Sequence, residues 1–503
     1  MIFRSMRSNI PFYTNVTHRL AAQPDYLLLI AVLGLLVFFR AWLTDVAHLE
    51  LHFDEALYWA YAQHLDWSYY EKGPVTAYAI ALFEMLFGKG EWQIRLPGWL
   101  ASSGFCALVF YFTRYVWHSR QAAWWSVILI IFTPTFFSIG LVITPDSFLW
   151  CFWTWGLWSI YKALFSNNRL AWYQTGAAVG LGALTKLSIG LLPAIVAIWM
   201  LIKKSWHPHF KNPHLWGGLL LMLIIMSPMI YWNALHDWGS IHHEQGHISS
   251  QGFSVMRGLE FIISQILIMS PIIMVLAIYE FRKKPSEENL KFLWLLTIIW
   301  IIFFLIKAMA GKIQVNWPAA SYISLIVLFA GVIESFSPIK RRALYIGLVF
   351  SMLFMFVYYF PSTIGLSSAK VATIAKMKAW HKPVTTLSNI NNDISFLVTN
   401  DYVIATELAF YWPQPIHVYV TGSQKRRYNQ YDFWPSINRE AGNNGLYVDI
   451  TPDTPALLDK AFESCTPISP IPAKADDGSI VRTLYAHYCK KYRPIQWPKP
   501  GYY

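Results

Sequence analysis

The chain has 503 residues, of which 55% are hydrophobic, 17% aromatic and only 14% charged. An average soluble domain has roughly 25% charged residues, so this composition excludes an ordinary soluble enzyme. Four cysteines in such a long chain exclude a disulfide scaffold, and 25 Trp, 28 Tyr and 33 Phe exclude a disordered protein. The net charge of +12 indicates basic cytoplasmic loops of a polytopic membrane protein, and we expect no nucleic-acid partner.

Apolar runs near the ~20 residues that cross a bilayer recur through most of the chain. We expect about eleven transmembrane helices, at 25–44, 96–116, 121–142, 147–165, 170–186, 188–202, 214–233, 259–279, 291–308, 317–335 and 342–360. The first run has no small-residue cleavage site and is followed by further spans. It is therefore expected to remain as a signal anchor.

Basic residues alternate with acids and histidines in the loops between these runs. Residues 1–24 and four later loops are basic and should face the cytoplasm, namely 118–120, 203–211, 282–284 and 340–342. The remaining loops should face outward: 45–95, the turn around Asp146, 234–258 and 308–316. An odd number of spans then places the C-terminal residues on the outer side as well.

The composition changes after the last span, where apolar runs shorten and Asn, Asp and Pro become frequent. We therefore expect a transmembrane domain at 25–360, with its long outer loops at 45–95 and 234–258, and a small soluble α/β domain at 361–503. Within the soluble domain the pattern predicts strands at 396–398, 416–420, 445–450 and 480–485 and helices at 405–411 and 455–462. Cys465 and Cys489 either pair in an oxidising compartment or remain buried free thiols.

Adjacent carboxylates, Asp54 and Glu55, follow the first span directly. An unpaired carboxylate at a membrane surface costs several kcal/mol to bury, so we expect one of the two to act in chemistry. The alternative is structural. In that case Asp54 caps the following helix, and Glu55 in its first turn is favoured by the helix dipole.

Cations also gather on the expected outer face. Lys72, which is followed by Gly-Pro, and Arg95 suit an anionic headgroup or a leaving phosphate, although each could instead extend toward lipid headgroups. Asp146 begins a span, where a plain helix cap is the alternative. Lys186 lies between two short spans and could point either to the headgroups or to a phosphate.

The outer loop 234–258 is rich in histidine and contains His243-Glu-Gln-Gly-His247, which satisfies the H-E-x-x-H pattern of zinc proteases. That pattern requires a helix, whereas Gly246 and the Ser-Gly segment after it favour irregular backbone. No third ligand follows. Two interpretations stay open, a histidine that contacts a metal or substrate and a set of solvated loop histidines.

Several short motifs together resemble one family. The motifs are Asp54-Glu-Ala, Ser68-Tyr-Tyr-Glu-Lys-Gly-Pro74, Phe87-Gly, Arg95-Leu-Pro97, Pro145-Asp146, Leu184-Thr-Lys186, Gly246-His247, Gln265 with Pro271, Asn316-Trp-Pro-Ala319, Thr406-Glu-Leu-Ala-Phe-Tyr411 and Arg427-Tyr-Asn-Gln-Tyr-Asp432. In this order they resemble the bacterial glycosyltransferase family 39 and its relatives. These are the protein O-mannosyltransferase-like and aminoarabinose transferase-like membrane enzymes of the GT-C fold.

The resemblance implies a polytopic α-helical membrane protein of GT-C type with a small C-terminal periplasmic α/β domain. It implies transfer of a sugar from a polyprenyl-phosphate carrier, without a nucleotide, on the periplasmic side of the bacterial inner membrane. The expected acceptor is a lipid or glycan of the cell envelope, lipid A and lipopolysaccharide above all. Membrane lipids are the remaining expected partner.

The resemblance also implies roles for individual residues. Asp54 lies where the family has its catalytic or acceptor-activating aspartate, and we expect Asp146 and Glu55 in the same catalytic site. The pair Glu71-Lys72 is similar to the Glu-Lys pair of the aminoarabinose transferases. There the lysine contacts the carrier phosphate, for which Arg95 and Lys186 are further candidates here. The glutamate helps to hold a divalent metal such as zinc with a loop histidine, which implies Glu71 and His247 in this chain.

Three other functions remain as alternatives. Protein O-mannosyl transfer is one, although many family members have Asp-His-Pro-Pro where this chain has Glu-Lys-Gly-Pro, which favours the lipid A-modifying side of the family. A transporter of lipid-linked sugars would carry ionisable residues in the middle of the membrane, whereas the charges here gather at one face. The third alternative is an intramembrane metalloprotease.

Overall fold

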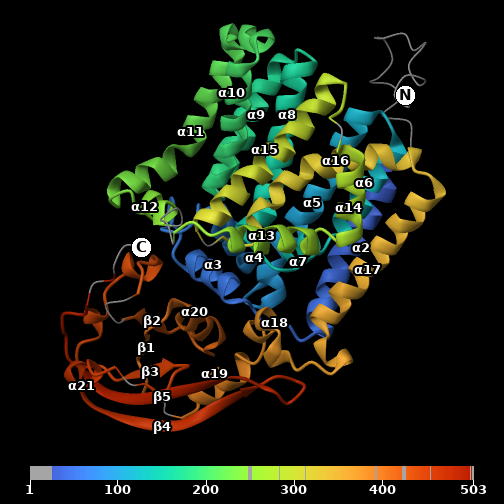
Figure 1. The fold of residues 1–503 in the computed structure, drawn as a ribbon. Helices are drawn as coiled ribbons and strands as arrows, with labels where there is room; N and C mark the ends of the chain where they lie inside the picture. The colour runs from blue at the N-terminus through green and yellow to red at the C-terminus, as the bar shows by residue number, and fades with distance from the viewer. Residues whose placement is uncertain are drawn as a thin grey trace.

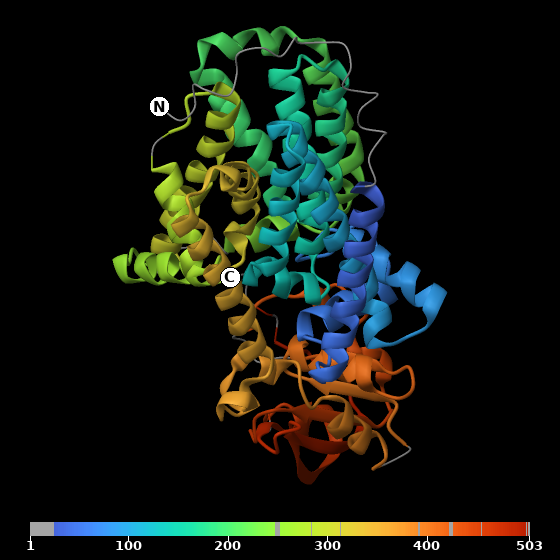
Figure 2. The same cartoon turned by 90° about the vertical axis from the view of Figure 1, so that its right-hand side faces the viewer.

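The structure, a computed structural model, describes residues 25–246, 252–282, 284–311, 313–390, 393–421, 426–453, 455–498 and 500. A bundle of long helices forms one layer, and a smaller domain built on a β-sheet lies against one end of it (Figures 1 and 2). The expected fold class, a polytopic helical membrane protein with a C-terminal α/β domain, is confirmed. The basic segment 1–24, expected in the cytoplasm, lies outside the described residues.

The described residues contain six helices that are long and apolar enough to cross a membrane. They are α2 (Asp25–Val46), α5 (Glu91–Trp117), α11 (Pro213–Leu235), α15 (Glu288–Ala310), the continuous η4, α16 and η5 (Trp317–Ser335) and α17 (Pro338–Tyr359). The number rises to nine if each of three bent pairs is one span. These pairs are α6 (Arg120–Phe132) with α7 (Pro134–Leu141), η2 and α10 (Leu187–Ile202) with η3 (Lys204–Lys211), and α13 (Val255–Ile268) with α14 (Pro271–Phe281).

Two further runs that we expected to be spans are also helices, α8 (Pro145–Phe165) and α9 (Arg169–Ala183). Neither meets the same length and hydropathy criteria, because α8 is rich in Trp and polar residues and α9 has only 15 residues. Both nevertheless lie inside the bundle, where α8 packs against α5 and α9 packs against α11 (Figure 1). The chain is therefore a multi-span membrane protein.

The run at 259–279 is not the straight span that the sequence suggests. Helices α13 and α14 meet at an angle of 103°. Ser270 has a φ of 73°, in the left-handed region, and Pro271 has no N–H to continue the hydrogen bonds of a helix. As a result α13 lies across the bundle in Figure 1, whereas α14 packs against α17 within it.

Three helices lie in the outer loops: α3 (Phe53–Gln63), α4 (Val75–Phe87) and α12 (Gly239–Gly246). The expectation of irregular backbone around Gly246 is wrong for α12. Contacts with neighbouring segments outweigh the low helix propensity of its glycines, because the Ser240 hydroxyl donates to the carbonyl of Tyr69 (3.0 Å) and His243 packs edge-on against Tyr70. His247, the second histidine of the H-E-x-x-H pattern, lies outside the described residues.

The C-terminal domain contains a five-stranded sheet in the order β2-β1-β3-β5-β4. Strands β1 (Phe396–Thr399), β2 (His417–Val420) and β3 (Gly445–Asp449) are parallel, and the hairpin of β4 (Phe462–Lys474) and β5 (Ile480–Tyr492) completes it. Helices cover and connect the strands: η6 (Pro361–Ile364), η7 (Ser368–Lys370), α18 (Ala372–Lys376), α19 (His381–Ser388), α20 (Tyr402–Tyr411), η8 (Gln430–Asp432), η9 (Ile437–Glu440) and α21 (Leu458–Ala461).

Strand β4 does not appear among the strands that the sequence predicts. It carries three prolines, Pro467, Pro470 and Pro472, which remove backbone donors and normally argue against a strand. Its position at the edge of the sheet explains why they are tolerated. The expected helix at 455–462 is correspondingly shorter, because β4 begins at Phe462. Cys465 and Cys489 face each other across β4 and β5 and form a disulfide, which decides between the two alternatives.

The first outer loop and the C-terminal domain share one hydrophobic core. Helix α3 packs against α20, and the core includes Leu57, Trp59, Leu408 and Phe410. The two parts must therefore lie on the same side of the membrane, which requires an even number of crossings between them. If only the six long helices of the described residues cross the membrane, five crossings follow α2, an odd number that does not meet this requirement. If the three bent pairs also cross, eight crossings follow α2, an even number that meets it.

Polar groups tie the same two parts together. The Glu50 carboxylate accepts hydrogen bonds from the backbone N–H groups of Trp380 and His381, and Lys378 donates to the carbonyl of Ala47 (2.8 Å). The hydroxyl of Tyr411 accepts from the N–H of Leu51 (2.8 Å) and donates to Glu91 (2.7 Å). Burial raises the pKa of Glu50 to about 7 and raises the pKa of Glu407 well above its ordinary value.

These carboxyl groups make the interface sensitive to pH. Because the pKa of Glu50 is higher in the folded chain than its ordinary 4.5, its contribution to stability is complete below about pH 4.5 and is lost as the pH rises through 7. We expect the melting temperature of the purified chain to fall between pH 5 and pH 8, and Glu50→Gln to reduce that fall. Part of this pH dependence of the melting temperature should persist in the variant, because the pKa of Glu407 is also raised. Identical slopes for the two proteins would contradict this prediction.

Candidate active site

Helix α3 begins with a capping box in which the side chain of Asp54 takes no part. The N-cap is His52, whose Nδ1 accepts from the N–H of Asp54 (3.3 Å), while the Glu55 carboxylate accepts from the N–H of His52 (2.9 Å). The structural alternative for Asp54, a helix cap, is therefore wrong. Its carboxylate lies 3.5 Å from His52 and is 39% exposed, so it can reach a substrate.

Glu55 and Arg95, in contrast, are fully buried and satisfy each other. Arg95 donates from Nε and Nη2 to the two carboxylate oxygens of Glu55 (3.0 and 2.8 Å), and its other hydrogen bonds go to the carbonyls of Leu49 and Glu50 (both 2.7 Å). Both side chains are at most 1% exposed. We expected Glu55 in catalysis and Arg95 at the carrier phosphate. The structure corrects both roles, because this pair instead fixes the base of α3.

The loop that carries Lys72 is held against the turn that carries Lys186. The N–H groups of Gly73 and Val75 donate to the carbonyls of Thr185 (3.4 Å) and Leu184 (3.2 Å). A Cβ atom at Gly73 would lie 2.1 Å from the Leu184 carbonyl oxygen, so this close approach requires glycine. The two lysines, 114 positions apart in the chain, thus come from adjoining backbone segments.

Asp146 lies in the first turn of α8, after the N-cap Thr144 and Pro145. It makes no cap hydrogen bond. Its Oδ1 accepts from Nζ of Lys186 (2.9 Å) and its Oδ2 from the amide of Asn316 (3.0 Å), at side-chain exposures of 10% for Asp146 and 14% for Lys186. Three separate segments therefore meet at this carboxylate, and Lys186 is oriented by an acid before any substrate binds.

Glu71 is 8% exposed, and burial raises its pKa, an effect that Arg427 and Lys72 oppose. Arg427 belongs to the C-terminal domain, and its Nη2 lies 3.8 Å from Oε1 of Glu71. The same Nη2 donates to the hydroxyl of Tyr402 (3.0 Å). Sequence reasoning assigned no role to Arg427 or Tyr402. In the sequence, Arg427 is marked only by its place in the segment 427–432, one of the motifs that resemble glycosyltransferase family 39.

Tyr58 on α3 connects these groups. Its hydroxyl is buried, and this burial raises the pKa of Tyr58 well above its ordinary value, with a further increase from the nearby carboxylates of Asp54, Glu71 and Asp146. Glu71 in turn interacts with both Lys72 and Asp54. The expected residues Asp54, Glu71, Lys72, Asp146 and Lys186 are thus brought together at one site.

The described residues contain no group of three or more His, Cys, Asp and Glu side chains that could hold a metal ion. Within that part of the chain, Oε1 of Glu71 is buried and accepts no hydrogen bond, which suits a ligand atom. Its expected partner, His247, lies outside the described residues, so the pairing with a zinc ion stays a prediction.

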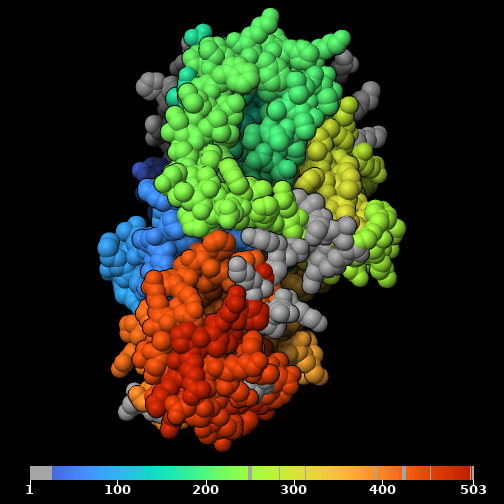
Figure 3. All heavy atoms as spheres, turned by 90° about the vertical axis from the view of Figure 1, so that its left-hand side faces the viewer, coloured from blue at the N-terminus to red at the C-terminus, as the bar shows by residue number. Residues whose placement is uncertain are grey.

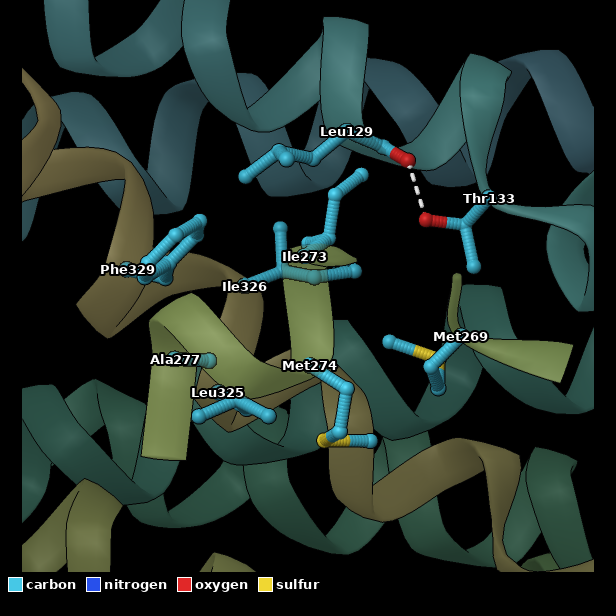
Figure 4. A pocket seen from close by; sticks show the side chains of 9 residues that line it. All are labelled: Leu129, Thr133, Met269, Ile273, Met274, Ala277, Leu325, Ile326 and Phe329. Atoms are coloured by element: carbon cyan, nitrogen blue, oxygen red, sulfur yellow. Dashed lines mark hydrogen bonds between the residues drawn. The ribbon is translucent and has the colours of Figure 1, made fainter. Parts of the chain in front are cut away.

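A pocket inside the bundle does not belong to this site. It lies between α6, α14 and α16 and is lined by apolar side chains such as Met269, Ile273 and Phe329 (Figure 4). Its one hydroxyl, on Thr133, donates to the carbonyl of Leu129 (2.5 Å). The pocket is therefore lined by no side chain that could act as an acid, a base or a phosphate ligand.

Comparison with known proteins shows what this chain is similar to. Residues 71–232 match the family model described as dolichyl-phosphate-mannose-protein mannosyltransferase. The chain is 26% identical to the lipid A galacturonosyltransferase RgtD of Rhizobium johnstonii over 61% of its length and 66% of that protein. It is 28% identical to the undecaprenyl phosphate-alpha-4-amino-4-deoxy-L-arabinose arabinosyl transferase of Erwinia tasmaniensis, over 33% of its length and 30% of that relative.

The fold matches the crystal structure of ArnT from Cupriavidus metallidurans bound to undecaprenyl phosphate. The match has a TM-score of 0.64 at 17% identity and covers 93% of this chain and 98% of ArnT. The fold is therefore that of the GT-C membrane glycosyltransferases. The resemblance to glycosyltransferase family 39 and the aminoarabinose transferase-like enzymes is confirmed.

The buried pair at the base of α3 can be tested by Arg95→Ala. Removing one partner leaves the Glu55 charge buried and unpaired, which typically costs about 3–5 kcal/mol. We expect low yield of folded protein and a large fall in melting temperature. Lys491→Ala, which breaks an exposed pair with Glu463, is the matched control and should leave the melting temperature almost unchanged, because exposed ion pairs are well screened by water. Similar melting temperatures for the two variants would show that the pair does not hold the loop.

Proposed function

We propose that this chain is a bacterial inner-membrane glycosyltransferase that moves a sugar from a polyprenyl-phosphate carrier to lipid A on the periplasmic side. The observation that carries the proposal is that Asp54, Lys72, Asp146 and Lys186, which come from separate segments of the chain, lie near one another. The relatives support the substrates. One is named for galacturonosyl transfer to lipid A, and another for an undecaprenyl phosphate-linked aminoarabinose.

The donor chemistry explains the lysines. When the bond between the sugar C1 and the phosphate oxygen breaks, negative charge develops on the leaving phosphate. A fixed cation at that phosphate lowers the barrier. Lys72 is the best candidate, because it is half-buried beside the site and the Gly73 contact sets the direction of its backbone. Lys186 is already paired with Asp146 and would orient that carboxylate.

The acceptor decides what Asp54 does. If the sugar is transferred to a hydroxyl, Asp54 takes the hydroxyl proton while the oxygen attacks C1, and the configuration at C1 inverts. If the acceptor is a lipid A phosphate, no base is needed and Asp54 orients the acceptor. Its exposure and its place in the first turn of α3 suit either role.

The periplasmic location is supported by two features of the C-terminal domain. The domain shares a core with the first outer loop, so the site and the domain lie on one side of the membrane. The Cys465–Cys489 disulfide suits an oxidising compartment such as the periplasm. The basic loops expected in the cytoplasm complete this orientation.

A divalent ion such as zinc, held by Glu71 and His247, remains part of the proposal. When bound there it would order the two outer loops around the substrate. Its support is the resemblance to the aminoarabinose transferases and the buried Oε1 of Glu71 without a hydrogen bond. The remaining coordination positions would be open.

Protein O-mannosylation is the second candidate, because the matching family model is described as a protein mannosyltransferase. Mass spectrometry of lipid A and of periplasmic glycoproteins, from cells with and without this chain, distinguishes the two. A sugar that disappears from lipid A on deletion and returns with the gene supports the proposal. An unchanged lipid A profile, with a hexose lost from proteins, would replace it by the second candidate.

Asp54→Asn keeps the volume of the side chain but removes its charge and its ability to accept a proton. We expect at least about a 100-fold loss of transfer if the acceptor is a hydroxyl. Purified protein with a lipid-linked donor gives the rate, and an unchanged melting temperature confirms folding. Near-normal turnover would mean that Asp54 is not the base and that the acceptor is a phosphate or is activated elsewhere.

Lys72→Ala should weaken donor binding and slow the chemical step together, since the same cation holds the phosphate before and during bond cleavage. We expect a loss of about 100-fold in kcat/KM, comparable to the removal of one oxyanion donor. Lys72→Arg should recover part of this, because a guanidinium also pairs with phosphate but is longer and planar. Equal activity of the three proteins would show that Lys72 only contacts lipid headgroups.

A further inference from the structure

Arg427 is a cation that the C-terminal domain places in the glycosyl transfer site. It lies in the loop between β2 and η8, and its guanidinium is 3.8 Å from the Glu71 carboxylate of the first outer loop. The side chains of Glu71 and Arg427 are 8% and 33% exposed. Figure 3 shows the C-terminal domain in contact with the light-green surface of α11 and α12, beside the loop that carries Glu71.

The position of Arg427 is fixed from both sides. Within its own domain, the hydroxyl of Tyr402 accepts from Nη2 (3.0 Å), and Tyr402 begins α20, the helix that packs on α3. The turn η8 that follows the loop contacts the first outer loop, since Gln430 of η8 accepts from the N–H of Tyr70 (2.7 Å) and Phe433, directly after η8, stacks on the Tyr70 ring. The guanidinium is therefore held beside Glu71 before any substrate binds.

The negative charge of Glu71 is expected to repel the phosphate of the sugar donor. Glu71 directly precedes Lys72, the residue proposed to bind the carrier phosphate, and its charge is little screened at 8% exposure. An ionised carboxylate near a phosphate repels it and weakens the attraction of the neighbouring lysine. This repulsion is stronger in a partly buried site than in water, because the effective dielectric constant there is lower.

We propose that Arg427 is a positioning residue that neutralises Glu71 and so leaves the charge of Lys72 available to the carrier phosphate. The C-terminal domain then completes the donor site, and its docking is required for tight binding of the carrier. This inference rests on the proposed function, because it takes an anionic polyprenyl phosphate as the ligand.

The experiment measures binding of undecaprenyl phosphate, and of uncharged undecaprenol, to the full chain in lipid nanodiscs, with a chelator in every sample. Arg427→Gln should weaken undecaprenyl phosphate binding about tenfold, and Arg427→Lys should stay within about threefold of the native chain. If the role of Arg427 is to cancel the charge of Glu71, adding Glu71→Gln to Arg427→Gln should restore most of the lost affinity. Undecaprenol binding should be the same in all variants.

The matched control is Arg426→Gln. Arg426 is the preceding residue and makes a bidentate pair with Asp432 of η8 (2.7 and 2.6 Å). Its loss tests whether disturbing the loop is enough to weaken binding. We expect undecaprenyl phosphate affinity within about threefold of the native chain, and melting temperatures establish that every variant is folded.

The other outcomes overturn one conclusion or the other. Failure of Glu71→Gln to rescue Arg427→Gln, or an equal loss in Arg426→Gln, overturns the role of Arg427 and leaves the proposed function standing. A native chain that binds undecaprenyl phosphate no better than undecaprenol overturns the proposed function, and this inference with it.

Discussion

The buried pair of Glu55 and Arg95 is the interaction on which the outer face of this protein depends. A charge pair without solvent is stable only if every donor and acceptor is satisfied, and here Arg95 also binds two loop carbonyls while Glu55 accepts the N–H groups of His52 and Ile143. The pair thus connects the segment between α2 and α3, which contains Leu49 and Glu50, to α3, to α5 and to the segment before α8. Asp54, the residue before Glu55, is 39% exposed beside this fixed pair.

That fixed base also explains why the C-terminal domain is part of the site. Helix α3 presents an apolar face to α20, and the two helices share a core that belongs to both domains. Because α20 begins at Tyr402, the same packing brings Tyr402 and Arg427 to Glu71. The membrane domain supplies the acids and lysines of the site, and the C-terminal domain contributes the cation Arg427 beside Glu71.

Several of the expected site residues have structural partners that their local sequence does not reveal. Arg95 and Lys72 look alike in sequence, as single cations in one outer loop, yet one is fully buried and the other borders the site. Asp146 looks like a helix cap, yet Lys186 and Asn316 hold it from two other segments. Each distinction depends on groups more than 35 positions away in the chain, which local patterns do not encode.

The sequence by itself determined the helices of the membrane layer, because a run of about twenty apolar residues has no other stable state in a bilayer. It also determined most of the sheet and, through ordered motifs, the resemblance to the glycosyltransferases. Only the tertiary structure decided which charged side chains form ion pairs with one another. It paired Glu55 with Arg95, bent the chain at Ser270, and brought Arg427 into the site. The physical reason is that burial and ion pairing depend on distances between segments, which folding sets and local sequence does not.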